Sequence, residues 1–423
     1  MTTLERCGIG ILGLSLGFAP LTPALAERTL LVPSQFPTIT AAMDSAAPWD
    51  TILVAPGMYV ERVVVKDGVL LASERGAAET TIAYDPAGTT ETEAVITLQK
   101  CSNSTQVVGF TIDGGGAAKR GVLAIGDGDP VVAECRIIGG SNGVGCHRNA
   151  SPHLVRTTIE GSQVAGVFIQ SGSADIRGCE IVRGEKVGLV IEGTTRPVQV
   201  RDTKIDGNAE VGVRASDGEF GMTGGSVSHN GNTGMLLQYV SPVIQGTVME
   251  GNANIGAVLE NSTDTQLACT VRKNAFGVLI AGTGEPKVFR CIFEDNPTAH
   301  IAAEGEVVPV IGGSIENANL FLGTTAAVIQ TGCLNSFNAT YNYWGKPCAT
   351  RDQVKRISGA RDVVRRPWVT ADLKHAFDSC EKARAHSSTP VRSRGAAAEA
   401  DTSAAPPQAA AEAPSQTAST ATP

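Results

Sequence analysis

Apolar residues recur along the central chain with a period close to 22 residues, and each recurrence begins at a glycine. Apolar residues stand one and three positions after every one of these glycines. The glycines are Gly121, Gly143, Gly166, Gly188, Gly212, Gly234, Gly256 and Gly277. Self-similarity at a fixed length is typical of stacked supersecondary units. Within a unit the apolar residues alternate with period two and many are β-branched, so we expect short strands.

A second apolar marker and a row of asparagines keep the same period. The marker residues are Ile137, Ile159, Ile181, Ile205, Val227, Met249, Val271 and Phe293. Three residues after the last five of these stand Asn208, Asn230, Asn252, Asn274 and Asn296. We expect these asparagines at tight turns with positive φ, which asparagine tolerates, and with side-chain amides bonded along the stack.

The period determines the expected fold. Three short strands and three turns fit in about 22 residues, and a continuously winding coil places each strand above its counterpart one turn earlier. We therefore expect an all-β fold, a right-handed parallel β-helix solenoid, with inward side chains such as Val167, Ile169, Val213 and Leu237. Residues 39–46 have apolar residues at helical spacing, which predicts a short N-terminal helix that caps the first coil.

The two ends of the chain differ from the repeats in composition. Residues 1–26 read as an export signal, because Arg6 precedes an apolar run and Ala24-Leu25-Ala26 offers a cleavage site. Residues 386–423 are rich in Ala, Pro, Ser and Thr and are expected to be disordered. The elongated domain should span 27–385, without an integral membrane segment in the mature chain. These features predict a periplasmic or extracellular protein.

Charge and cysteine content narrow the picture further. The net charge of −8 argues against nucleic acid as a partner. Five of the ten cysteines fall at inward repeat positions, where we expect buried thiols: Cys135, Cys146, Cys179, Cys269 and Cys291. A disulfide could form among Cys101, Cys333, Cys348 and Cys380, and the sequence does not decide the pairing.

Two terminal segments carry a family resemblance. The run from Val32 to Leu71, and the closing segment Asn338-Ala339-Thr340-Tyr341-Asn342-Tyr343-Trp344-Gly345 with Arg366-Pro367-Trp368, resemble the pectin-lyase-like right-handed parallel β-helix superfamily. The resemblance covers roughly residues 30–375 and is closest to its exported carbohydrate-binding and sugar-hydrolase-type members. It implies the fold but no particular reaction, because the superfamily includes lyases, hydrolases, esterases, epimerases, phage tailspikes and proteins without a known reaction.

One group of polar residues remains as candidate chemistry. Asp127 and Asp129 follow one Gly-apolar strand, and His147 and Arg148 stand at nearly the same repeat phase one coil later, hence about 5 Å away. Abstraction of a proton beside a uronic carboxylate needs a neutralised carboxylate and a nearby base. We expect Asp127 and Asp129 to be able to hold Ca²⁺, with His147 and Arg148 completing a catalytic set. The alternative is a solvated turn whose Asp/Arg ion pair contributes little to stability.

A stripe of apolar residues lies where side chains should face outward. It occupies the second position after six of the eight repeat glycines: Leu123, Phe168, Val190, Leu236, Val258 and Leu279. A contiguous exposed apolar strip usually marks a contact surface, so we expect a protein partner or a second copy there. Strand propensity alone, or a covering segment, is the competing explanation.

Two functional hypotheses follow from these observations. The first is an exported β-helix that binds cell-surface or matrix carbohydrate, with polysaccharide lyase or glycoside hydrolase activity left open. The second is a non-catalytic structural or protein-interaction scaffold of the cell envelope. The known acid/base motifs of the superfamily are missing; Asp129-Pro130, for example, is followed by Val131 where an alginate epimerase has histidine.

Overall fold

The computed structural model describes residues 27–88, 92–346, 348, 351–357, 359–379 and 381–382. The expected export signal (1–26) and the expected tail (386–423) lie outside the described residues, as does Cys380. No helix among the described residues is long and apolar enough to cross a membrane.

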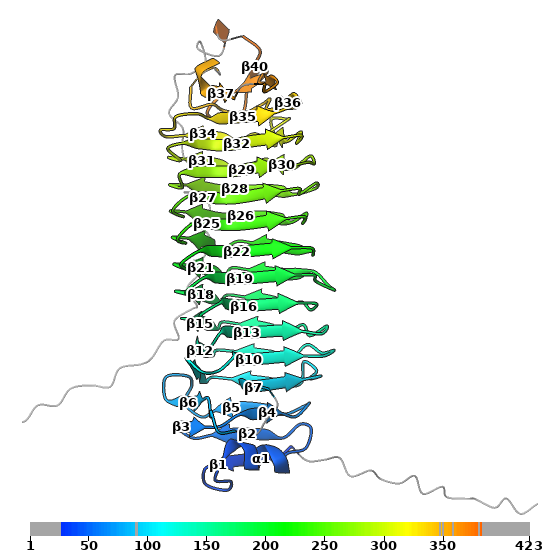
Figure 1. Ribbon diagram of the computed structural model, residues 1–423, viewed down its shortest axis with the longest axis vertical. Helices are drawn as coiled ribbons and strands as arrows, with labels where there is room; N and C mark the ends of the chain where they lie inside the picture. Colours follow the sequence, from blue (N-terminus) through cyan, green and yellow to red (C-terminus); the bar gives the residue numbers. More distant parts are fainter. Residues whose placement is uncertain are drawn as a thin grey trace, which may run out of the picture.

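The described chain is a parallel β-solenoid of about 15 turns, which confirms the expected fold class (Figure 1). Three strands wind around each regular turn, and one of the three joins a sheet of 13 parallel strands in the described chain. We call this the long sheet. Its strands are β4 (Val63–Val65), β7 (Ala94–Gln99), β10 (Arg120–Ile125), β13 (Asn142–His147), β16 (Ala165–Gln170), β19 (Val187–Glu192), β22 (Val211–Ser216), β25 (Thr233–Gln238), β27 (Ile255–Glu260), β29 (Phe276–Ala281), β32 (Ala299–Gly305), β35 (Ile329–Cys333) and β37 (Val354–Arg356).

The other two strands of each turn belong to a second sheet, with 25 strands in the described chain. They are β1 (Thr29–Val32), β2 (Thr51–Val54), β3 (Gly57–Val60), β5 (Leu70–Ser73), β6 (Thr80–Ala83), β8 (Gln106–Val108), β9 (Thr111–Gly115), β11 (Val131–Ala133), β12 (Arg136–Gly139), β14 (His153–Val155), β15 (Thr158–Glu160), β17 (Asp175–Arg177), β18 (Glu180–Val182), β20 (Val198–Arg201), β21 (Lys204–Asp206), β23 (Phe220–Thr223), β24 (Ser226–Ser228), β26 (Val243–Glu250), β28 (Gln266–Arg272), β30 (Lys287–Val288), β31 (Ile292–Glu294), β33 (Val310–Ile311), β34 (Leu320–Leu322), β36 (Phe337–Asn338) and β38 (Val363–Val364).

Short elements close the two ends of the column. The helix α1 (Ile39–Ser45) packs against β1, β2 and β4 at one end, as the helical spacing predicts (Figure 1). The Thr38 hydroxyl accepts a hydrogen bond from the Ala41 amide at 3.1 Å, which caps the helix. At the other end lie the 3₁₀ turn η1 (Arg351–Gln353) and the antiparallel pair β39 (Trp368–Val369) and β40 (Ala376–Phe377).

The repeat glycines are required for space. Gly166 is followed by two inward side chains, Val167 and Ile169, and both are fully buried. A Cβ atom on Gly166 would lie 2.4 Å from Cγ2 of Ile181 and 2.7 Å from the carbonyl oxygen of Gly188. No side chain fits at that separation, so this corner of the turn can close only around glycine.

The asparagines form the predicted ladder inside the solenoid. Each of the first four donates its side-chain amide to the side-chain oxygen of the next, over 2.9 to 3.3 Å, and all five are buried. The expectation of positive φ at these asparagines is wrong. The left-handed residue is the one before each asparagine, for example His229 (φ 51°) before Asn230. The chain bends one residue earlier, and each asparagine can then direct its amide into the stack.

The cysteines behave largely as expected. Cys135, Cys146, Cys179, Cys269 and Cys291 are buried free thiols, and burial raises the pKa of each. Among the four left open, Cys101 and Cys333 are also free, whereas Cys348 is disulfide-bonded. The thiols therefore act as small apolar core residues.

Candidate functional site

A break in the outer face of the long sheet produces the strongest candidate site. In register, Leu123 on β10 lies beside Gly145 on β13, and Gly145 lies beside Phe168 on β16. Because Gly145 has no side chain, Arg120 lies across it. A Cβ atom on Gly145 would be 2.8 Å from Cδ of Arg120 and 3.2 Å from Nε2 of His147.

This arrangement forms a hollow of about 340 Å³, which we call the cationic depression. Its lining contains two arginine side chains and one histidine side chain, and no carboxylate. The lining residues are Arg120, Leu123, Ile125, His147, Arg148, Gln170 and Ser171. In the register of the sheet, Ile125, His147 and Gln170 lie side by side on three consecutive strands, so the hollow spans three turns.

The electrostatics of the depression keep its histidine neutral near pH 7. Burial lowers the pKa of His147 below its usual value, and the charges of Arg120 and Arg148 lower it further. Burial also lowers the pKa of Arg120, which Glu93 partly opposes, but an arginine remains charged. The Arg120 Nε and His147 Nε2 atoms are both buried without a hydrogen-bond partner. Such unpartnered groups are rare in folded proteins and call for an explanation.

The two predicted aspartates line a neighbouring hollow. Asp127 and Asp129 lie with Asn149, Thr195 and Arg196 around a shallow notch of about 500 Å³. Arg196 donates a hydrogen bond from Nη2 to the Asn149 carbonyl oxygen at 3.0 Å. The structure thus brings His147 and Arg148 together, and Asp127 and Asp129 together, but in two adjacent hollows instead of one.

The notch has a limited set of metal ligands. Asp127 and Asp129 supply two carboxylates, and Ca²⁺ takes six to eight oxygen ligands. Among the residues that the structure describes, no group of three or more His, Cys, Asp or Glu side chains is placed to hold a metal ion. A calcium ion there would depend on amide, carbonyl and water oxygens as well, and the calcium site stays a prediction.

The outward apolar stripe is less exposed than a contact surface requires. Leu123 and Val190 are only 4% and 1% exposed. Val190 belongs to a small outer cluster with Ala165 and Val187, against which Phe168 packs. The expectation that these six side chains are all exposed is therefore wrong for Leu123 and Val190. Phe168, Leu236, Val258 and Leu279 are partly exposed.

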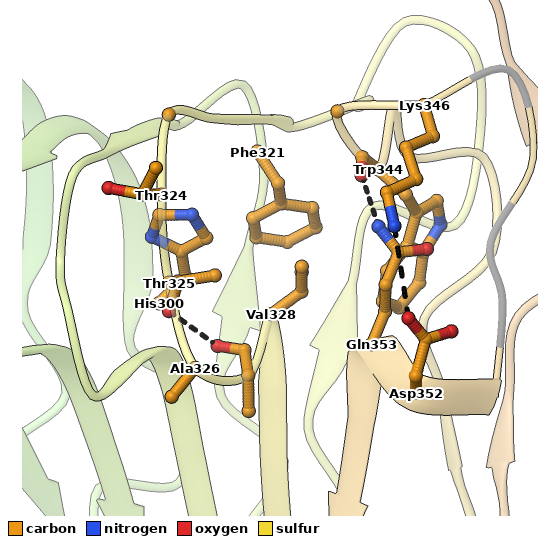
Figure 2. A pocket seen from close by; sticks show the side chains of 13 residues that line it. His300, Phe321, Thr324, Thr325, Ala326, Val328, Trp344, Lys346, Asp352 and Gln353 are labelled. Atoms are coloured by element: carbon orange, nitrogen blue, oxygen red, sulfur yellow. Dashed lines mark hydrogen bonds and ion pairs between the residues drawn. The ribbon is translucent and has the colours of Figure 1, made fainter.

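A cleft of about 260 Å³ near the C-terminal end has no counterpart in the sequence-based expectations (Figure 2). His300 occupies the repeat position of the glycines, 23 residues after Gly277. It is buried, stacks on Phe321 with ring centroids 5.9 Å apart, and has a pKa lowered to about 4 by burial. Its Nδ1 lies 3.1 Å from the side-chain nitrogen of Asn296, where the asparagine ladder ends.

The rim of this cleft is polar. Thr324 and Thr325 stand on one side, and Lys346 and Asp352, whose charged atoms are 3.8 Å apart, stand on the other (Figure 2). The aromatic rings lie below the rim and belong to the core. The missing glycine at position 300 could have signalled this departure from the repeat. Among the described residues that line it, the cleft has no unpaired charge, in contrast to the cationic depression.

Sequence reasoning missed the residue that shapes the cationic depression. Arg120 stands just before a repeat glycine, a position that elsewhere holds mostly apolar residues. The usable signal was Gly145, since it interrupts the outward apolar stripe on the turn that follows that arginine. A glycine on the outer face of a sheet, with a long cationic side chain on the neighbouring strand, predicts that the cationic side chain lies over the glycine.

Comparisons with known proteins agree with this architecture. A family described as "Right handed beta helix region" matches residues 67–205 and 165–315. Among solved structures, the A-modules of the Azotobacter vinelandii mannuronan C-5 epimerases AlgE4 and AlgE6 superpose with TM-scores of 0.50 and 0.51. Sequence identities are 17% and 15%, and the matches cover 77% and 78% of this chain and 90% and 94% of those chains.

A third similar structure is less close. The catalytic domain of a GH87 α-1,3-glucanase matches with a TM-score of 0.46 and 10% identity, over 78% of this chain and 68% of that one. No curated protein sequence matches the chain. At these identities the structural likeness shows the fold alone.

Proposed function

Because the chain belongs to the right-handed β-helix family, we propose that it is an exported protein that binds acidic carbohydrate of the cell surface or surrounding matrix. The binding site is the cationic depression on the outer face of the long sheet. The export signal expected at residues 1–26 supports the location. The fold is shared with carbohydrate-active enzymes, which supports the ligand class without specifying it.

The observation that carries the proposal is a hollow with two arginines and no carboxylate. Most arginines on the outer surface form an ion pair with an acidic side chain, as Arg156 does with Glu134 at 2.5 Å. In the depression, Arg120 and Arg148 face the same space without an acidic residue in the lining. A guanidinium group matches a carboxylate in shape and charge, and such bonds are about twice as strong as neutral ones.

The remaining lining suits a sugar ring. Gln170 and Ser171 offer donors and acceptors for hydroxyl groups. The Phe168 ring lies beside His147, with ring centroids 5.8 Å apart, and is partly exposed. An aromatic face of this kind packs against the apolar side of a pyranose. A uronic acid unit therefore matches the depression better than a neutral sugar.

Cleavage is the finer part of the hypothesis. His147 is a neutral imidazole beside two arginines, and a neutral imidazole can accept a proton near pH 7. A uronic carboxylate bound to Arg120 would have its charge neutralised, which favours removal of the proton next to it. Asp127 and Asp129 line the adjacent notch and would act on the neighbouring sugar unit.

The test is a binding panel measured by isothermal titration calorimetry at pH 6, with and without calcium. Hexamers of uronic acids are compared with neutral hexamers of glucose and mannose. We expect binding of acidic hexamers only, and each mixture is also assayed for new double bonds and reducing ends. Absence of binding to every acidic hexamer would contradict the proposal and leave the non-catalytic envelope scaffold as the better account.

A further inference from the structure

We propose that binding of an acidic group in the cationic depression is coupled to protonation of His147, so that up to one proton enters the site with each bound carboxylate. This inference rests on the proposed function and adds a regulatory property to it. Binding would strengthen in an acidic environment and weaken in a neutral or alkaline one.

The position of His147 is the first support. Its side chain projects from the end of β13, and its Nε2 faces the same gap over Gly145 that Arg120 crosses. Neither the His147 Nε2 atom nor the Arg120 Nε atom has a hydrogen-bond partner, although both are buried. The imidazole is therefore in a site where a proton and a counter-charge could both be accommodated.

The imidazole has neighbours on three sides, and charged groups lie on two of them. Arg120 approaches from β10, and Arg148 follows directly on the same turn. From β16 the neighbours are Phe168 and Gln170, which carry no charge. Glu93 acts on Arg120, but it forms an ion pair with Lys119. The empty depression thus holds positive charge around His147, which opposes a third positive charge.

A bound carboxylate reverses this balance. In the free protein the pKa of His147 lies below its usual value, because burial and the two arginines disfavour the charged ring. A carboxylate at the arginines offsets their charge and adds a direct attraction, so the pKa of His147 in the complex is higher. The gain in affinity is complete below the free-state pKa and absent above the pKa in the complex. Affinity therefore rises as the pH falls.

Arginines alone would give a different result. Arginine keeps its charge throughout the physiological range, and a uronic carboxylate is ionised well above pH 4, as other carboxyl groups are. A site built only on Arg120 and Arg148 would bind equally at pH 5.5 and pH 8. A pH dependence in this interval consequently reports a histidine.

The experiment is calorimetric titration of wild type with an acidic hexamer at pH 5.5, 6.5 and 8, each in two buffers of different ionisation heat. If the complex raises the pKa of His147 by about one unit, affinity at pH 5.5 exceeds that at pH 8, and the gain approaches its limit of about tenfold as the pH falls below the free-state pKa. The difference in heat between buffers gives the number of protons taken up, which should lie between zero and one and peak between the free-state pKa of His147 and its pKa in the complex.

His147→Gln should bind with one affinity at all three pH values, and it should lose the proton uptake. The matched control is His153→Gln, because His153 lies on β14 beside Asp175 and outside the depression; it should keep the wild-type slope. Imidazole proton resonances of the wild type, with and without ligand, provide a second readout that needs no variant.

The outcomes separate the two proposals. Tight binding of the acidic hexamer with the same affinity from pH 5.5 to 8 would overturn the coupling and leave the proposed function intact. An unchanged slope in His147→Gln, or a His147 resonance whose pKa does not rise with ligand, would overturn it as well. Absence of binding at every pH would remove the function and the coupling together.

Discussion

The asparagine ladder and the cationic depression are two polar regions built on the same repeat, and they differ in how their polar atoms are satisfied. Inside the solenoid, Asn252 donates to Asn274 at 3.0 Å and to the carbonyl oxygen of Val227 at 3.0 Å, while its own oxygen accepts from Asn230 at 2.9 Å. On the outer face, nitrogen atoms of Arg120 and His147 are buried without partners.

The difference separates a structural polar row from a binding surface. A satisfied buried hydrogen bond contributes about 1 kcal/mol, whereas a buried polar group without a partner costs about 1 to 3 kcal/mol. The ladder therefore stabilises the stack of turns. The depression carries a cost in the free protein, and a ligand that supplies the missing acceptors can offset it. Departures from the repeat mark the candidate site, and adherence to the repeat marks the core.

The largest effect is expected from placing an unpaired charge inside the column. Ile169→Asp should lower the free energy of unfolding by about 4 kcal/mol or more, because Ile169 is fully buried among apolar residues. Urea denaturation followed by circular dichroism measures the loss. The control is Gln170→Asp, one residue later on the exposed face of β16; equal destabilisation by the two changes would refute the inward and outward assignments.

A smaller loss of stability is expected from breaking the ladder. Asn252→Ala leaves the amide of Asn230 and the carbonyl of Val227 without partners, which should cost about 2 to 4 kcal/mol. Asn254→Ala, two residues away and exposed, is the matched control and should change stability by less than about 0.5 kcal/mol. Thermal melts of both variants decide the point. Indistinguishable melting curves for Asn252→Ala and Asn254→Ala would show that the ladder contributes little to stability.

A change on the outer face should weaken ligand binding and leave stability nearly unchanged. Gly145→Val adds a β-branched residue to a strand position where other turns have Phe168 and Val190, so stability should stay within about 0.5 kcal/mol. The new side chain displaces Arg120, and affinity for an acidic hexamer should fall by roughly tenfold or more. The control is Gly332→Val, an outward glycine with ordinary space around it. Retained affinity in Gly145→Val would show that the gap does not form the site.

Much of the fold could be predicted from the sequence because stacking repeats each constraint in every turn. Glycine must recur where a Cβ atom would meet the next turn, and asparagine must recur where a ladder is bonded. The φ angle of the asparagines was not predictable in this way. A 22-residue spacing is the same whether the bend falls on the asparagine or on the residue before it, such as His229 before Asn230.

The candidate site was predicted only in part, for a related reason. The number of the turn gives the height of a residue along the column and the repeat phase gives its position around the turn, so the sequence predicted that His147 and Arg148 lie near Asp127 and Asp129. It does not say towards which hollow a turn directs its side chains, and Asp127 and Asp129 line the adjacent notch. Alternation likewise predicts that Val190 faces outward but not that Ala165 and Val187 cover it.

The most direct test of the proposed function compares two double variants with the same loss of charge. Arg120→Gln with Arg148→Gln removes both arginines of the cationic depression. Arg75→Gln with Arg156→Gln removes two exposed arginines whose partners, Glu79 and Glu134, are also exposed. Calorimetric affinity for one acidic hexamer is measured for both double variants and for wild type, at equal ionic strength.

If the depression is the binding site, the first double variant should lose affinity by roughly 100-fold or more, because bonds to charged groups contribute about 1.5 to 3 kcal/mol each. The second should bind within about twofold of wild type, since its lost charges are distant and screened by salt. Equal losses in the two variants would show that binding follows net charge alone. Wild-type affinity in the first variant would show that the acidic carbohydrate binds elsewhere on the column.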